Sequence, residues 1–202
     1  MIAKPVLDAV RLVIESFDQI GAEYVIGGSV ASALYGMDRS TVDVDIATNL
    51  KLDQVASFVD NLQDEYYADI EMIKDAIAHC SSCNLIYLGN WIKIDLFVTK
   101  GSEFDKAEFR RAKRDTFTLS DGTINLRVAS PEDVILRKLI WYRDGGGTSE
   151  RQWLDVLGVL KIQARRLDRP YMAEWAADLG ISDLLDGAIE DAGLPPMEDI
   201  DF

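Results

Sequence analysis

The sequence predicts an α+β protein in which a mixed β-sheet flanked by helices is followed by a small helical bundle. In the first half, two apolar segments are separated by Gly89-Asn90, a pair typical of a tight β-hairpin turn. The character changes at Ser130-Pro131-Glu132-Asp133, which combines an N-cap, a proline at the first helical position and acidic residues in the first turn. We therefore expect a core over 1–128 and a helical region over 129–202.

Local patterns predict the individual elements. Apolar residues recur at helical spacing from Val6 to Phe17 before Gly21, Tyr24–Ile26 is a short apolar run, and Asp121-Gly122 indicates a second hairpin. The expected helices cover residues 5–19, 29–35, 52–62, 70–78, 131–143, 149–164, 171–178 and 182–192. The expected strands cover residues 24–26, 42–47, 84–88, 91–98, 114–119 and 123–128.

The strand over 91–98 carries a carboxylate in apolar company. Successive side chains of a strand point to opposite faces, so the four apolar residues at even positions from Ile92 to Val98 share one face. Lys93, Asp95 and Phe97 share the other. Asp95 is therefore a candidate for a functional role.

The composition excludes several classes of protein. With 202 residues and 48% hydrophobic content, the chain can form a proper core. It has no apolar signal region at its start and no apolar run long enough to cross a bilayer, so we expect a cytoplasmic protein with no membrane association. A formal net charge of −14 argues against tight, non-specific binding to nucleic acid.

Basic residues and cysteines form three small groups. We expect two basic clusters to be solvated faces: Arg110, Arg111, Lys113 and Arg114, and Lys161, Arg165, Arg166 and Arg169. Cys80 and Cys83 lie beside the only histidine, His79, and three ligands are too few for a structural zinc site. We expect reduced thiols at a helix end and a strand start.

The segment from Gly27 to Asp45 combines residues that suit phosphate and metal binding. In Gly27-Gly28-Ser29, glycine has no side chain in the way, so backbone N–H groups can approach phosphate oxygens. Asp43 and Asp45 are spaced i and i+2 on a predicted strand, so both carboxylates face the same side. Carboxylate oxygens are the ligands that magnesium prefers.

Taken in order, these residues resemble the signature of the polymerase-β-type nucleotidyltransferase superfamily. The resemblance rests on Gly28-Ser29, the Asp43-Val44-Asp45 pair and the later Asp95. Further motifs resemble a small stand-alone bacterial branch that includes the AbiEii-type toxin nucleotidyltransferases of type IV toxin–antitoxin systems. They are Arg39-Ser40-Thr41-Val42-Asp43-Val44-Asp45, Pro131-Glu132-Asp133 followed by Lys138-Leu139, and Arg151 followed by Asp155.

The resemblance implies a nucleotidyltransferase fold, a catalytic core over 1–128 and a helical region over 129–202 that completes the cleft. It implies that the chain moves a nucleoside monophosphate from a nucleoside triphosphate to an acceptor hydroxyl, using two magnesium ions. Asp43, Asp45 and Asp95 would be the catalytic and metal-binding residues. The implied nucleotide-binding residues are Gly28, Ser29, Arg39, Thr41, Lys138 and Asp155.

The surroundings of Lys138 and Asp155 carry further expectations. Lys138 lies on a helix whose apolar positions face the core, so it can extend toward a cleft and place a charge on the triphosphate, or it is an exposed helix lysine. Asp155 stands among apolar residues, which suggests partial burial with a partner such as Arg151 one turn earlier.

Three functions stay open at this stage. The first is a nucleotidyltransferase that acts on RNA, protein or a small molecule, including a toxin that modifies transfer RNA and has an antitoxin partner. The second is a partner protein that keeps the fold without the activity, although a retired site has no physical need to hold repelling carboxylates together. The third is an aminoglycoside-type adenylyltransferase, whose cationic substrate would suit an acidic cleft.

Overall fold

The computed structural model describes residues 2–35, 43–119 and 122–196, which form two compact units. The first unit comprises Met1–Val30 and Ser40–Ala129, and the second comprises Ala31–Arg39 and Ser130–Phe202. The long C-terminal segment of the second unit begins at Ser130. The described residues from Ala31 to Tyr35 belong to the second unit.

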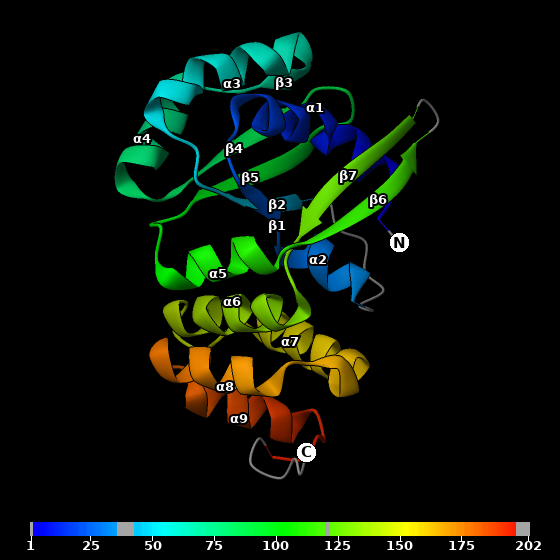
Figure 1. Cartoon of the computed structure of the whole chain (residues 1–202), viewed down its shortest axis with the longest axis vertical. Helices are drawn as coiled ribbons and strands as arrows, with labels where there is room; N and C mark the ends of the chain where they lie inside the picture. The colour runs from blue at the N-terminus through cyan, green and yellow to red at the C-terminus, as the bar shows by residue number, and fades with distance from the viewer. Residues whose placement is uncertain (1, 36–42, 120–121, 197–202) are drawn as a thin grey trace. The chain divides into compact units, whose positions relative to one another are not determined.

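A mixed sheet of seven strands, all within the described residues, is the centre of the first unit (Figure 1). Its spatial order is β3-β4-β5-β2-β1-β7-β6. The parallel pairs are β2 with β5 and β1 with β7, and the other neighbours are antiparallel. The strands are β1 (Tyr24–Ile26), β2 (Asp43–Thr48), β3 (Tyr66–Tyr67), β4 (Ser82–Tyr87), β5 (Ile92–Val98), β6 (Lys113–Leu119) and β7 (Gly122–Val128). The predicted fold class, α+β with a mixed sheet flanked by helices, is confirmed.

Helices α1, α3 and α4 lie together over the sheet in Figure 1. The first-unit helices are α1 (Lys4–Ile20), α2 (Gly28–Leu34, which continues into the second unit), α3 (Val55–Leu62), α4 (Ile70–His79) and α5 (Glu103–Arg111). Gly21, with φ of 70°, ends α1 by donating its N–H to Phe17 O. The Phe17 ring stacks on Tyr24 and on Phe58, with centroids 5.5 and 4.8 Å apart, so these aromatics join α1 to the sheet and to α3.

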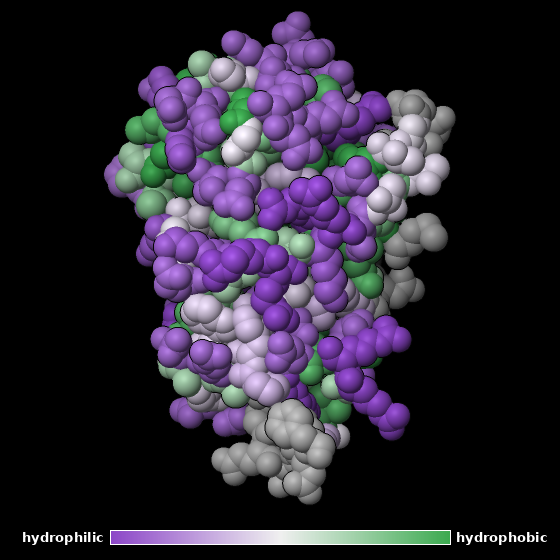
Figure 2. Space-filling view, in the orientation of Figure 1, coloured by the Kyte–Doolittle hydropathy of each residue, from purple (hydrophilic) through white to green (hydrophobic). Residues whose placement is uncertain are grey.

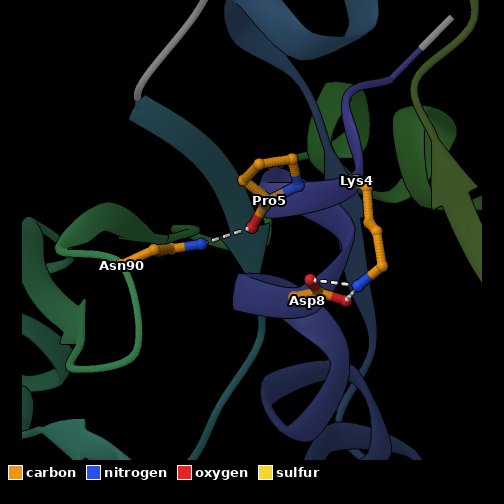
Figure 3. Close-up of polar contacts among 4 residues, drawn as sticks. All are labelled: Lys4, Pro5, Asp8 and Asn90. Carbon is orange, nitrogen blue, oxygen red and sulfur yellow. Dashed lines mark hydrogen bonds and ion pairs between the residues drawn. The ribbon is translucent and has the colours of Figure 1, made fainter.

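The hairpin between β4 and β5 differs from the predicted two-residue turn. Tyr87 pairs with Ile92, so the loop has four residues, and Trp91 adopts a left-handed φ of 61° while its N–H donates to Tyr87 O at 2.8 Å. The Asn90 side chain donates to Pro5 O at 2.9 Å, near the Lys4–Asp8 ion pair at the start of α1 (Figure 3). This bond fixes the loop from which β5 departs.

Helix α5 was missed in the sequence. Its start is a capping box: Ser102 Oγ accepts from Asp105 N at 3.1 Å, and Asp105 Oδ2 accepts from Ser102 N at 2.9 Å. Ser102-x-x-Asp105 carries that signal, but the charged residues that follow it obscure the apolar spacing. Phe104, Ala107 and Phe109 are nevertheless buried.

The second unit is a helical bundle. Its helices include α6 (Pro131–Asp144), α7 (Glu150–Gln163), α8 (Arg169–Asp178) and α9 (Ser182–Asp191). Ser130 caps α6 by accepting from Asp133 N at 3.2 Å, and its hydroxyl donates to Asp133 Oδ2 at 2.6 Å. The other Asp133 oxygen accepts from the Tyr171 hydroxyl at 2.6 Å, so this buried carboxylate links α6 to α8.

The surface is consistent with the composition of the chain. The face seen in Figure 2 is largely hydrophilic, with hydrophobic side chains in scattered patches. Among the helices that the structure describes, none has both the length and the apolar character needed to pass through a bilayer.

Candidate functional site

The three predicted catalytic aspartates lie on two neighbouring parallel strands. The register pairs Asp45 of β2 with Asp95 of β5, and Asp43 with Lys93. Partners in register on adjacent strands share a face, so all three carboxylates lie on one face of the sheet. Residues between them, such as Val44 and Ile94, are fully buried on the opposite face. The alternation thus fixes the direction of each carboxylate.

Gly28 lies against one of these carboxylates. It has φ of +55°, and a Cβ atom built on it would collide with Asp45 Oδ2 and lie only 2.8 Å from Asp45 Cβ. The adjoining Gly27 donates its N–H to Asp45 O at 2.9 Å. The glycine turn and the aspartate strand are therefore in direct contact. Ser29 follows at the start of α2, where it is 7% exposed.

A cation that the sequence analysis did not select lies within the carboxylate group. Lys93 Nζ is 2.9 Å from Asp95 Oδ2, with side-chain exposures of 43% and 20%. The hydrogen bond to Asp95 raises the pKa of Lys93, and the negative charges of Asp95, Asp43 and Asp45 add to that effect. The sequence places Lys93 and Asp95 on the same strand face, because residues at i and i+2 share a face. That Asp43 lies opposite Lys93 is known only from the register of β2 with β5.

The donor set fits a hard divalent cation. Three carboxylates on one face offer only oxygen ligands, as magnesium prefers. Because residue 28 is glycine, no side chain at that position displaces the Asp45 carboxylate. Among the described residues, no three acidic, histidine or cysteine side chains converge closely enough to hold an ion as they stand. The Asp95 carboxylate binds Lys93 instead.

The negative charge also acts on a thiol of the neighbouring strand. Cys83 is buried in β4, opposite Leu96 in the register with β5. Burial, with a smaller effect of the Asp95 charge, raises the pKa of Cys83 to about 11. Cys80, by contrast, is exposed at the left-handed C-cap of α4, and both thiols are free. The expected helix end and strand start are therefore observed.

In the second unit, Lys138 and Asp155 bind each other. Lys138 Nζ donates to Asp155 Oδ2 at 2.8 Å and to Gln152 Oε1 at 3.1 Å, joining α6 to α7. Each of the paired side chains is 4% exposed. Lys138 is thus buried and is not an exposed helix lysine. The expected burial of Asp155 is observed, but its cation is Lys138 on another helix rather than Arg151.

The predicted site residues thus fall into three groups. Gly28, Asp43, Asp45 and Asp95, with Ser29 next to Gly28, belong to the first unit, whereas Lys138 and Asp155 form a pair in the second. Arg39 and Thr41 lie outside the described residues. Lys93 and Gln152 were not selected from the sequence, and the contacts that they make with Asp95 and Lys138 identify them.

Comparison with known proteins gives structural likeness without a sequence match. No family model and no curated protein matches the sequence. Solved structures that match include a nucleotidyltransferase-like antigenic protein from Paracoccidioides brasiliensis, at 16% identity and a TM-score of 0.41. The match covers 75% of this chain and 74% of that one.

Two other matching structures are named as enzymes or resistance factors. The antibiotic-resistance factor ANT(2'')-Ia matches at 12% identity, over 94% of both chains, with a TM-score of 0.48. The CCA-adding enzyme of Thermotoga maritima, solved with tRNA, matches at 15% identity over 92% of this chain and 53% of that one, with a TM-score of 0.39. These TM-scores are below 0.5, so likeness of this degree does not identify the activity of the chain.

Proposed function

We propose that the chain is a magnesium-dependent nucleotidyltransferase that moves a nucleoside monophosphate from a nucleoside triphosphate to an acceptor hydroxyl. The observation that carries this proposal is the β2–β5 register, which puts Asp43, Asp45 and Asp95 on one face. The collision that a side chain at position 28 would have with Asp45 supports it further. Phosphate-binding backbone and metal-binding carboxylates must be adjacent for this chemistry.

Asp43 and Asp45 would hold two magnesium ions, and Asp95 would complete the ligand set on the side of the nucleophile. When bound, such ions lower the pKa of the attacking hydroxyl and neutralise the departing pyrophosphate. The acceptor oxygen forms a bond to the α-phosphorus as the bond to the pyrophosphate oxygen breaks. Asp95 would take the proton of the acceptor hydroxyl.

Gly28 and Ser29 would bind the β- and γ-phosphates through the backbone and the Ser29 hydroxyl. Because Gly28 has no Cβ, the Asp45 carboxylate can lie directly against its backbone, which keeps the proposed phosphate-binding turn next to the proposed metal ligands. Arg39 and Thr41 stay predicted phosphate-binding residues.

Lys138 and Asp155 are the second-unit part of this proposal, as nucleotide-binding residues. A lysine ammonium has three donors, of which Asp155 and Gln152 take two. Because both paired side chains are only 4% exposed, the Lys138 charge would have a fixed position.

The acceptor is RNA, protein or a small molecule. The formal charge of −14 argues against a broad electropositive surface that would bind nucleic acid. The AbiEii-like toxin role, with its antitoxin partner, stays a prediction from the sequence, as does an aminoglycoside-type adenylyltransferase. A catalytically retired partner protein is disfavoured, because three carboxylates on one face of the sheet repel one another and Lys93 offsets only one of these charges.

The test is an incubation with each nucleoside triphosphate, labelled at the α- or the γ-phosphate, with magnesium and either cell RNA or a small-molecule pool. The proposal expects the α-label, and not the γ-label, to enter an acceptor. The acceptor that becomes labelled distinguishes RNA from small-molecule substrates. Transfer of the γ-label would instead indicate a kinase, and no transfer with any triphosphate would favour the retired partner protein.

A further inference from the structure

Lys93 occupies a defined place among the carboxylates of the first unit. It is opposite Asp43 across the β2–β5 pair and two residues before Asp95 on its own strand. Because these positions share a face, Lys93 has one carboxylate beside it across the strands and another beside it along its own strand. Its ammonium is 2.9 Å from Asp95 Oδ2, which is the distance of a charge-assisted hydrogen bond.

We propose that Lys93 is a tethered cation that offsets part of the negative charge of the carboxylates in the metal-free protein and competes with the metal ion for Asp95. This inference rests on the proposed function, because it concerns the same ligands. Before any ion binds, the Lys93 ammonium lessens the repulsion among the three carboxylates.

Lys93 and a metal ion would compete because both bind the Asp95 carboxylate. The Asp95 carboxylate that would bind a metal ion also binds Lys93 Nζ through Oδ2, and a divalent cation beside it would repel the ammonium. Lysine is a compact point charge on a flexible stem, and the Lys93 side chain is 43% exposed. It can therefore move into solvent without breaking buried packing.

The exchange makes metal affinity depend on Lys93. An ion must displace the ammonium, so the chain binds metal more weakly than its three carboxylates alone would. Removal of the lysine charge should consequently tighten binding of the ion, although the removed group is near the site. A residue with a merely structural role would have the opposite effect.

The experiment measures Mn²⁺ binding to the full-length chain by the loss of the free-ion electron paramagnetic resonance signal. We compare the wild type with Lys93→Met, which removes the charge, and with Lys93→Arg, which keeps it. Lys100→Met is the matched control, because it removes one lysine charge at an exposed position just after β5. Circular dichroism establishes that each variant is folded.

Lys93→Met should bind Mn²⁺ roughly two- to fivefold more tightly than the wild type, the change that an exposed charge pair is worth. Lys93→Arg and Lys100→Met should bind like the wild type. Equal or weaker binding by Lys93→Met overturns the inference and leaves the proposed metal site intact. Absence of Mn²⁺ binding in all four proteins overturns the metal site and the inference together.

A second measurement needs no variant. Acetic anhydride acetylates accessible lysine amines, and peptide mass spectrometry gives the extent at each position. Added Mg²⁺ should increase acetylation of Lys93 relative to Lys100, because the displaced ammonium is no longer held by Asp95. An unchanged ratio at saturating Mg²⁺ would contradict displacement.

Discussion

The Asp45 carboxylate packs against Gly28 and occupies the place where a side chain at position 28 would begin. The requirement for glycine at this position therefore has two sources, the positive φ of +55° and the contact with Asp45. In the proposed function, this contact joins the phosphate-binding turn to the metal-binding strand.

The first prediction concerns Gly28→Ala. The new methyl group should displace the Asp45 carboxylate, so nucleotidyl transfer should fall by at least about 100-fold, since small misplacements are costly in catalysis. Urea unfolding should show a loss of about 2 kcal/mol or more from the φ strain and the overpacking together.

Gly101→Ala is the control for that variant. Gly101 has φ of +70°, but no atom lies within 4 Å of the place that a Cβ would take, so only the backbone strain changes, at about 1 kcal/mol. Its transfer activity should stay near that of the wild type. Equal loss of activity in both variants would show that Asp45 displacement is not the cause.

The second prediction concerns the buried pair of Lys138 and Asp155. Lys138→Met removes the ammonium that binds the Asp155 carboxylate, which is only 4% exposed, so the free energy of unfolding should fall by about 3–5 kcal/mol. The double variant Lys138→Met/Asp155→Leu should regain most of that stability, because both buried charges are gone.

Urea unfolding of Lys138→Met, Asp155→Leu and the double variant measures this coupling. Activity then separates structure from function: the double variant should be stable yet defective in nucleotide binding. A stable double variant with wild-type triphosphate affinity would show that the pair is purely structural.

The third prediction uses the two cysteines. Because burial and the Asp95 charge raise the pKa of Cys83 to about 11, only about one thiol in a thousand is ionised at pH 8. Iodoacetamide, which reacts with the thiolate, should therefore modify exposed Cys80 and spare Cys83. Reaction at Cys83 should accelerate as the pH rises toward 11.

Asp95→Asn supplies the check on the electrostatic part of this effect. Removal of that charge should lower the Cys83 pKa and speed alkylation at pH 8, as measured by peptide mass spectrometry. A Cys83 rate that equals the Cys80 rate in the wild type would contradict the raised pKa.

Local patterns in the sequence were sufficient for much of the fold. Alternating burial along Ile92–Val98 follows from a period of two, and it correctly placed Asp95 on the opposite face. Gly21 ended α1 as its position predicted. The C-terminal helices also begin close to their predicted starts, because Ser130 and similar caps act within one turn.

Contacts between distant segments could not be predicted in the same way. Lys93 and Asp43 are opposite each other only because β2 and β5 pair in parallel in this register, across about fifty residues of chain. The choice of Lys138 over Arg151 as the partner of Asp155 depends on how α6 packs on α7. Sequence spacing favours the neighbour within a helix, whereas packing selects the buried one.

In the proposed function, the carboxylates on one face of β2 and β5 carry out nucleotidyl transfer. A set of Asp→Asn variants, assayed with α-labelled triphosphates and magnesium, tests this role most directly. Asp43→Asn, Asp45→Asn and Asp95→Asn should each lose at least about 100-fold in transfer while remaining folded. Asp115→Asn, at an exposed position on β6 of the same sheet, should keep wild-type activity. Wild-type transfer by the three site variants would contradict the account.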